Sequence, residues 1–225
     1  NLDAVSGMMI LKEAPLPADI VKLGVERINK IWRDAKLRAV GMKRAKTLVN
    51  KAEHSIGSHE APEAARVELG ILLNDYEMYN HRMEELMQTA FPIHERRDIA
   101  TQRLYADTVR SFHNHIITKD ETPIGLITYW DFEHFLYIEH FAIDPSLRNK
   151  GYGKDVLEII KEGNKKPIVL EAEEPTDEMS IRRISFYQRA GFVMHEYPYL
   201  QPPYRKGDQW FPLKLMTFGN IDMQK

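Results

Sequence analysis

Residues 143–157 read IDPSLRNKGYGKDVL and carry the strongest local signal in the chain. An apolar segment ends where this stretch begins, and an amphipathic segment typical of a helix follows its glycines. Between them lie two cations and three residues that tolerate a left-handed backbone: Arg148, Lys150, Asn149, Gly151 and Gly153. A strand that runs into such a turn and then into a helix leaves the first amides of the helix pointing outward, where they can bind phosphate. The stretch therefore predicts a phosphate-binding loop.

The pattern of this loop excludes two common nucleotide sites. It lacks the GxxxxGK[ST] run of a Walker loop and the third glycine of a dinucleotide fingerprint. What remains is Arg148-x-x-Gly151-x-Gly153, with Glu139 on the preceding strand and Tyr187-x-x-x-Gly191-Phe192 on a later helix. In this order the features resemble the GNAT acyltransferases, over residues 91–218. Asn149 stands where that family often has a further glycine, and its tolerance of left-handed geometry predicts that binding is kept.

The resemblance implies a set of site residues. Acetyl-CoA would be the acyl donor, with its pyrophosphate on the loop amides, and no metal is implied. Tyr187 would be the general acid that protonates the departing CoA sulfur. The implied cofactor-binding residues are Phe141, Ala142, Ile143, Arg148, Asn149, Lys150, Gly151, Tyr152, Gly153 and Lys154.

A base is needed to take the proton of the acceptor amine, and the strand before the loop offers Glu139. A carboxylate is costly to bury on a central strand, which favours a site role, although an ion pair with an arginine would satisfy it equally. Glu171 and Glu173 alternate onto one face of the next strand and are the second choice. His140 is expected to point to the opposite face by strand alternation and to be structural.

From residue 91 onward, predicted helices and strands alternate. Helices are expected over 91–111, 151–163 and 178–192, and strands over 113–118, 123–132, 134–144, 167–174, 192–200 and 210–218. This order predicts an α/β fold with a mixed central sheet flanked by helices. The first strand of the family should precede residue 91, where the chain is helical instead. Either the sheet lacks this edge strand or SGMMILKE, residues 6–13, supplies a substitute.

Residues 1–88 are expected to form an all-α segment, and residues 89–225 the acetyltransferase domain. Apolar residues recur at helical spacing over 19–39 and 43–57. A heptad seam follows, formed by Ala65, Leu69, Leu72, Tyr76, Tyr79, Met83 and Leu86. The seam favours a helical hairpin within the chain, and the alternative is a short oligomeric coiled coil that would make a homodimer.

The amino-acid sequence of residues 8–86 also resembles the helical linker of insertion-sequence transposases, which join a RuvC-like nuclease domain to a serine-bearing domain. No catalytic motif of that family is found within these residues, so recombinase chemistry is not implied. Basic helices between residues 19 and 46 would suit a nucleic-acid-binding accessory protein only if they were exposed. A basic helix folded onto an acidic one is the commoner explanation, and we do not expect nucleic acid as a partner.

Composition limits the function classes further. The chain has 225 residues, with 31 Lys and Arg against 33 Asp and Glu, so its net charge of −2 is not that of a polyanion-binding protein. It has no cysteine and therefore no thiolate nucleophile or cysteine zinc site. No apolar run reaches the roughly 18 residues of a membrane helix, and no signal-peptide pattern is found. We expect no membrane partner and a cytoplasmic location.

The predicted function is direct transfer of acetyl from acetyl-CoA to an amine of a small molecule or peptide. Tyr197, Tyr199, Tyr204 and the glutamates of residues 171–174 favour a cationic or aromatic amine as acceptor. The alternative is a degenerate acyltransferase fold without catalysis, which acts as a binding and self-association module.

Overall fold

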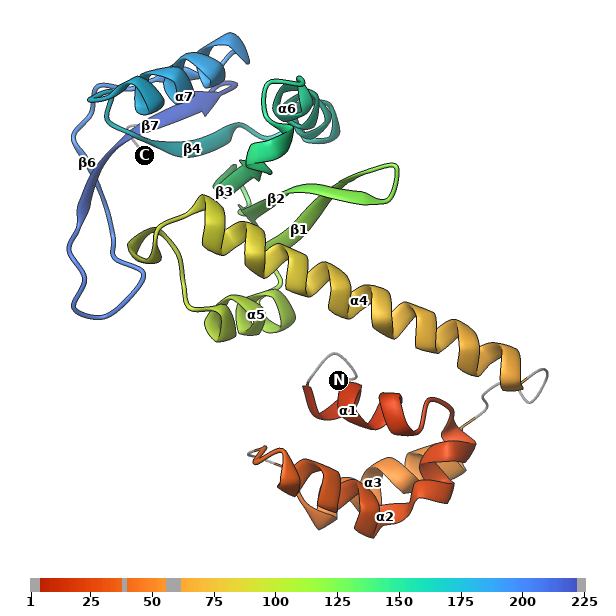
Figure 1. Ribbon diagram of the computed structural model, residues 1–225. Coiled ribbons are helices and arrows are strands. Elements are labelled where there is room, and N and C mark those ends of the chain that lie inside the picture. Colours follow the sequence, from red (N-terminus) through yellow and green to blue (C-terminus); the bar gives the residue numbers. More distant parts are fainter. Residues whose placement is uncertain (1–4, 38–39, 56–61, 222–225) are drawn as a thin grey trace. The chain divides into compact units, whose positions relative to one another are not determined.

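The computed structural model describes residues 5–37, 40–55 and 62–221 (Figure 1). The chain divides into two compact units, Asn1–Asn80 and His81–Lys225. The boundary between the units falls within helix α4, Pro62–Ala90, so the helix begins in the first unit and ends in the second. In the part of the chain that the structure describes, no helix combines the length and hydropathy required to span a membrane.

The first unit is helical and has its own core. It contains α1, Val5–Glu13, α2, Pro17–Asp34, α3, Met42–Glu53, and the first part of α4. Apolar residues at helical spacing meet in a buried cluster of Ile10, Ala14, Ile20, Ile28, Ile31, Trp32, Ala45 and Val49. The two predicted helices at 19–39 and 43–57 are thus confirmed as α2 and α3, while their predicted last residues, 38–39 and 56–57, lie outside the described residues.

The substitute edge strand at residues 6–13 was a wrong alternative, because these residues form α1. Ile10 and Ala14 lie one helical turn apart and are both buried in the helical core. The indole N–H of Trp32 donates to the carbonyl of Ser6 at 2.8 Å, which ties α1 to α2. The sequence of α1 is therefore used to close a helical core and not a sheet.

The heptad seam lies on α4, as predicted, but two residues in its middle are exposed. Leu72 and Tyr76 are 57% and 45% exposed. Leu86 is buried in a cluster with Met87 and with Leu126 of the second unit's sheet. The predicted hairpin therefore does not account for the middle of the seam.

The second unit is built on a seven-stranded mixed sheet. Its strands are β1, Phe112–Lys119, β2, Thr122–Asp131, β3, Leu136–Ile143, β4, Ile168–Glu173, β5, Val193–Met194, β6, Tyr199–Gln201, and β7, Phe211–Phe218. The order is β1-β2-β3-β4-β7-β5, with β6 also paired to β7. Only β3 and β4 are parallel neighbours among these strands. This sheet confirms the predicted fold class.

Helices cover both faces of the sheet (Figure 1). The helical segments of this unit are the end of α4, η1, Ile93–Glu95, α5, Ile99–Thr108, η2, Pro145–Leu147, α6, Tyr152–Gly163, and α7, Glu178–Arg189. Alternation along β2 separates Leu126, which packs on the end of α4, from Ile127, which belongs to the main core. That core includes Leu157 of α6 and Ile184 of α7.

Two predicted elements are shorter than expected. The helix expected over 91–111 is divided into η1 and α5, and the side chain of Asp98 begins α5 by accepting the N–H of Thr101 at 2.9 Å. The strand expected over 192–200 is divided into β5 and β6, with Pro198 among the residues between them. No further strand pairs with the outer side of β1 in the described ranges, which agrees with the loss of an edge strand.

Candidate active site

The centre of the sheet opens between β3 and β4. These strands pair over only three residues, ending at Ile138 opposite Leu170, although β3 continues to Ile143 and β4 to Glu173. Beyond this point the backbone of β3 has no bonds to β4, and an unpaired strand edge offers its N–H and C=O groups to a ligand. The first residue past the last pair is a glutamate on each strand, Glu139 on β3 and Glu171 on β4.

A β-bulge lies at this opening. On the other side of β3, Tyr129 is opposite Ile138 and Thr128 is opposite His140, so Glu139 is an extra residue in β3. A bulge interrupts the alternation of side chains along a strand. Glu139 and His140 consequently line the same cavity, and the expectation that His140 points to the opposite face was wrong.

His140 is buried and fully bonded, as expected of a structural residue. Its Nε2 lies 2.9 Å from the carbonyl oxygen of Glu95, which can only accept, so Nε2 carries a proton and donates. Its Nδ1 lies 2.9 Å from Oγ1 of Thr128 and accepts from that hydroxyl. Burial lowers the pKa of His140, so the ring is neutral and joins η1 to β2 and β3.

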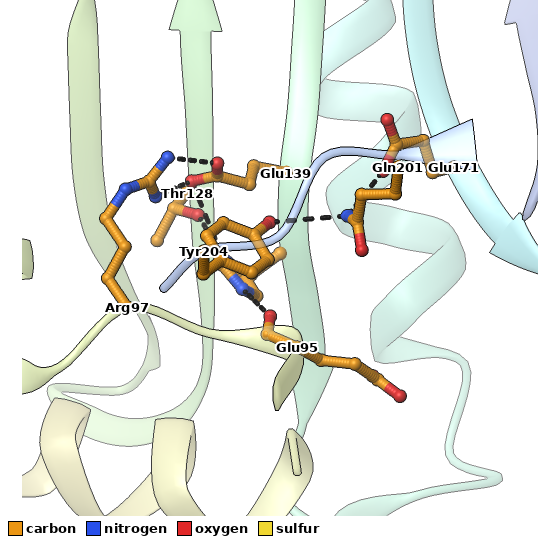
Figure 2. Close-up of polar contacts among 8 residues, drawn as sticks. Glu95, Arg97, Thr128, Glu139, Glu171, Gln201 and Tyr204 are labelled. Atoms are coloured by element: carbon orange, nitrogen blue, oxygen red, sulfur yellow. Dashed lines mark hydrogen bonds and ion pairs between the residues drawn. The ribbon is translucent and has the colours of Figure 1, made fainter. Parts of the chain in front are cut away.

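Glu139 forms a buried ion pair with Arg97, on the segment between η1 and α5 (Figure 2). Nη1 and Nη2 of the guanidinium lie 2.5 and 2.6 Å from the two carboxylate oxygens. The side chains are 12% and 4% exposed, respectively. Four rings surround the guanidinium at 5.0 to 5.6 Å, those of Tyr105, Phe112, Trp130 and Tyr204. The alternative of an arginine partner for Glu139 is therefore the one observed.

Glu171 has a different environment. The hydroxyl of Tyr199 and the side-chain amide of Gln201 donate to its carboxylate, the latter at 2.6 Å. Within the described residues, no lysine or arginine forms an ion pair with it. Burial raises the pKa of Glu171, and the nearby negative charge of Glu139 adds to the rise, while the hydrogen bonds oppose it. A carboxylate of this kind takes up a proton more readily than an ordinary glutamate.

The predicted phosphate loop connects β3 to α6. Asn149 and Gly151 have positive φ values of 66° and 90°, as their residue types led us to expect. Helical bonding in α6 starts with the N–H of Lys154, which donates to the carbonyl of Gly151 at 2.9 Å. The amides ahead of it are left without helical partners at the positive end of the helix dipole. Arg182 of α7 donates to the side chain of Asn149 and adds a cation at this end.

Tyr187 lies on α7 and lines the same cavity. It is 7% exposed and packs between Phe186 and Phe192, with ring centroids 5.2 and 5.8 Å away. Burial raises its pKa to about 12. The phenol is thus protonated at neutral pH and can donate a proton to a strong base.

One cavity of about 1060 Å³ joins these features. Its walls include most of the predicted residues, namely Glu139, Phe141, Ala142, Ile143, Arg148, Asn149, Gly151, Tyr152, Gly153, Lys154, Glu171, Glu173 and Tyr187. Lys150 is exposed and is not one of the lining residues. Arg148 and Lys154 line the cavity at the loop and the start of α6, which suits the phosphates of a nucleotide cofactor. Glu95, Glu139, Glu171 and Glu173 line it from η1, β3 and β4.

Sequence reasoning missed Glu95, Arg97, Arg182 and Gln201 among the residues of this site. Glu95 and Gln201 line the cavity, and Arg97 holds Glu139. Arg97 is 42 residues from Glu139 in sequence and is one of two adjacent arginines. No local pattern distinguishes it from Arg96, so only the fold reveals the pair.

Comparisons with known proteins agree with this geometry. The model of the acetyltransferase (GNAT) family matches residues 76–192. A solved structure from Bacteroides thetaiotaomicron, described as a GNAT-family acetyltransferase, is 52% identical, with a TM-score of 0.64, and the match covers 68% of this chain and 86% of that one. YjbC of Bacillus subtilis (strain 168), named as an acetyltransferase, is 29% identical over 111 residues, which are 48% of this chain and 55% of YjbC.

The present chain thus matches about half the length of YjbC. A Bacillus subtilis acetyltransferase solved in complex with CoA is 15% identical over 54% of this chain and 86% of that one, with a TM-score of 0.38, too distant to carry an argument. The family model and the Bacteroides relative together identify the family of this chain. The chain belongs to the GNAT family of acetyltransferases.

Proposed function

We propose that this protein transfers an acetyl group from acetyl-CoA directly to an amine of an acceptor molecule, without a metal. The observation that carries the proposal is the opening between β3 and β4, which shares one cavity with the loop at the start of α6. The loop amides and the side chains of Arg148, Lys154 and Arg182 would hold the phosphates of CoA. The unpaired edge of β3 over residues 141–143 would bond the pantetheine arm and polarise the acetyl carbonyl.

The reaction needs one base and one acid. The acceptor nitrogen bonds to the carbonyl carbon of the thioester, and the bond between that carbon and sulfur breaks. The proton of the amine goes to the base, and the departing thiolate takes a proton from Tyr187, whose burial keeps it protonated until then.

We assign the base role to Glu171 in preference to Glu139. Both oxygens of Glu139 accept hydrogen bonds from the Arg97 guanidinium, so its charge is already neutralised. Glu173 forms an ion pair with Arg183. Glu171 lines the cavity without such a partner in the described part of the chain, and its raised pKa favours proton uptake.

Titration of acetyl-CoA into the purified protein tests the cofactor site. Gly151→Glu should abolish saturable binding, because the side chain would meet the phosphates with a negative charge. Gly163→Glu adds the same charge at the other end of α6, where a side chain meets no atom within 4 Å, and should leave binding unchanged. Absence of binding by the wild-type protein would contradict the proposal and support a non-catalytic fold.

Release of the CoA thiol with amine acceptors tests the chemistry. We expect Glu171→Gln and Tyr187→Phe each to lower kcat by about 10²- to 10⁴-fold, the usual contribution of a positioned acid or base. Glu139→Gln should disturb stability more than it disturbs proton transfer. A full loss of kcat in a folded Glu139→Gln protein, with Glu171→Gln active, would return the base role to Glu139.

The helical unit supports a separate proposal about association. Exposed Leu72 and Tyr76 leave the middle of the heptad seam available for a homodimer. Light scattering of the purified chain should give twice the mass of one chain, and Leu72→Lys should return it to a monomer. The resemblance of residues 8–86 to a transposase linker, the absence of a nucleic-acid partner and the cytoplasmic location stay predictions.

A further inference from the structure

The acceptor side of the cavity contains more negative charge than one base requires. Five glutamates line the cavity, four of them on η1, β3 and β4 and the fifth, Glu174, just after β4. Glu174 forms an ion pair with Lys214 at 3.8 Å. Glu139 is neutralised by Arg97, and Glu173 by Arg183. In the described residues, neither Glu95 nor Glu171 forms an ion pair with a lysine or arginine. Two carboxylates of this cavity therefore form no ion pair with a lysine or arginine in the described part of the chain.

Glu95 has no role in the proposed proton transfer, yet its carboxyl is partly withdrawn from water. Burial raises its pKa, and the negative charge of Glu173 raises it further. Nε2 of His94 lies 3.6 Å from its carboxylate, on a side chain that is 42% exposed and charged only when protonated. The charges of His94 and Arg183 oppose the rise in the pKa of Glu95, but Arg183 forms its ion pair with Glu173. A partly buried anion without a partner is unfavourable, and a ligand cation beside it would offset that cost.

Aromatic rings line the same part of the cavity. His94 and Phe211 stack at 4.8 Å between ring centroids, and the ring of Phe91 meets His140 edge-on at 4.7 Å. Tyr204, from the loop between β6 and β7, adds a further ring over Arg97. Such walls suit a methylene chain, and their faces attract an ammonium group. In Figure 2, Glu95 is drawn below Tyr204, and Glu171 lies beside Gln201.

We propose that the acceptor is an amine with a second cationic nitrogen, joined to the first by an apolar chain, as in an aliphatic diamine. This inference rests on the proposed acetyl transfer. The nitrogen beside Glu171 loses its proton to that carboxylate and bonds to the acetyl carbon. The second nitrogen remains protonated and binds Glu95, which selects the acceptor and takes no part in the bond changes.

Matched acceptors test this assignment. We would compare α,ω-diamines of three to eight carbons with monoalkylamines of the same length, such as 1,5-diaminopentane with 1-aminopentane, by release of the CoA thiol. The best diamine should exceed its monoamine in kcat/KM by about tenfold or more, as a hydrogen bond between charged groups predicts. In Glu95→Gln this ratio should fall to about one. Glu162→Gln, an exposed residue of α6 outside the cavity, should keep the wild-type ratio.

A binding measurement distinguishes the proposed acetyl transfer from the proposed cation site at Glu95. Titration of the best diamine into the protein in the presence of CoA reports on Glu95 without acetyl transfer. Diamine binding that is lost in Glu95→Gln, with no turnover of any amine, would reject the transfer and keep the cation site. Equal kcat/KM for diamines and monoamines, or a ratio unchanged by Glu95→Gln, would overturn the present inference and leave the transfer standing. Failure of diamines to bind would also overturn it.

Discussion

Replacement of Arg97 by Ala should be one of the most damaging single changes in the second unit. The Arg97 and Glu139 side chains are 12% and 4% exposed, and two hydrogen bonds of 2.5 and 2.6 Å join them. Removal of one partner leaves the other as an uncompensated buried charge, which typically costs about 3–5 kcal/mol. The guanidinium also lies near four rings, and the loss of those contacts adds to the cost.

A double-mutant cycle separates the pair from its surroundings. Arg97→Ala and Glu139→Gln should each lower the free energy of unfolding by about 3–5 kcal/mol, and the double variant should lose clearly less than the sum, by about 1–3 kcal/mol. Urea unfolding followed by tryptophan fluorescence suits the measurement, because the ring of Trp130 lies 5.6 Å from the guanidinium. A loss below about 1 kcal/mol in either single variant, or additive losses, would refute the reasoning.

The same residue should affect acceptor binding more than cofactor binding. Arg97 bonds the bulged strand through Glu139 and lies under Tyr204 of the β6–β7 loop, at 5.0 Å from its ring. Arg97→Lys keeps the positive charge but loses the bidentate hydrogen bonding to Glu139, so the cavity wall that Glu139 and Tyr204 form should become less ordered. We expect a higher KM for the amine and an unchanged dissociation constant for acetyl-CoA, whose loop lies at the start of α6.

Three further changes test other parts of the site. Tyr199→Phe removes a donor that stabilises the charged form of Glu171, so the pKa of Glu171 should rise. The acidic limb of the pH profile of kcat/KM should then move to higher pH by up to about one unit. An unmoved limb would argue against Glu171 as the base. Asn149→Val should weaken acetyl-CoA binding about tenfold in a titration, because the left-handed backbone costs a β-branched residue about 1–2 kcal/mol. Asn149→Gly should bind acetyl-CoA normally. Equal affinities of the two variants would exclude this conformational role. Gly125→Ala should lower the melting temperature, because the added carbon would lie 2.4 Å from a carbonyl oxygen of β3, and Gly163→Ala, with open space around it, should not.

The loop at the start of α6 could be predicted from the sequence, because its conformation depends on local residue types. The left-handed positions at Asn149 and Gly151 follow from residue types that tolerate them, and the helix after them follows from apolar periodicity. The mixed sheet follows from the order of helical and strand segments. These features depend on neighbours in sequence, so a single sequence reveals them.

The acceptor side depends on contacts between distant segments. Strand alternation placed His140 on the wrong face, because the bulge at Glu139 arises from the pairing of β2 with β3 and has no residue signature here. The choice between Glu139 and Glu171 likewise depends on Arg97, which reaches β3 from a segment 42 residues earlier. Residues 6–13 show the converse case, where an apolar run was compatible with a strand until the helical core around Ile10 was known.

The register of β3 and β4 explains why the site needs Arg97. The last parallel pair joins Ile138 to Leu170, so the next residue of each strand, Glu139 or Glu171, stands at the mouth of the same opening. Two ionised carboxylates there would repel each other. Arg97 offsets this repulsion by forming an ion pair with Glu139, while the pKa of Glu171 stays raised by burial and by the charge of Glu139. Under the proposed base role of Glu171, the ion pair would act on catalysis through this second carboxylate, and loss of Arg97 should disturb proton transfer even where the fold survives.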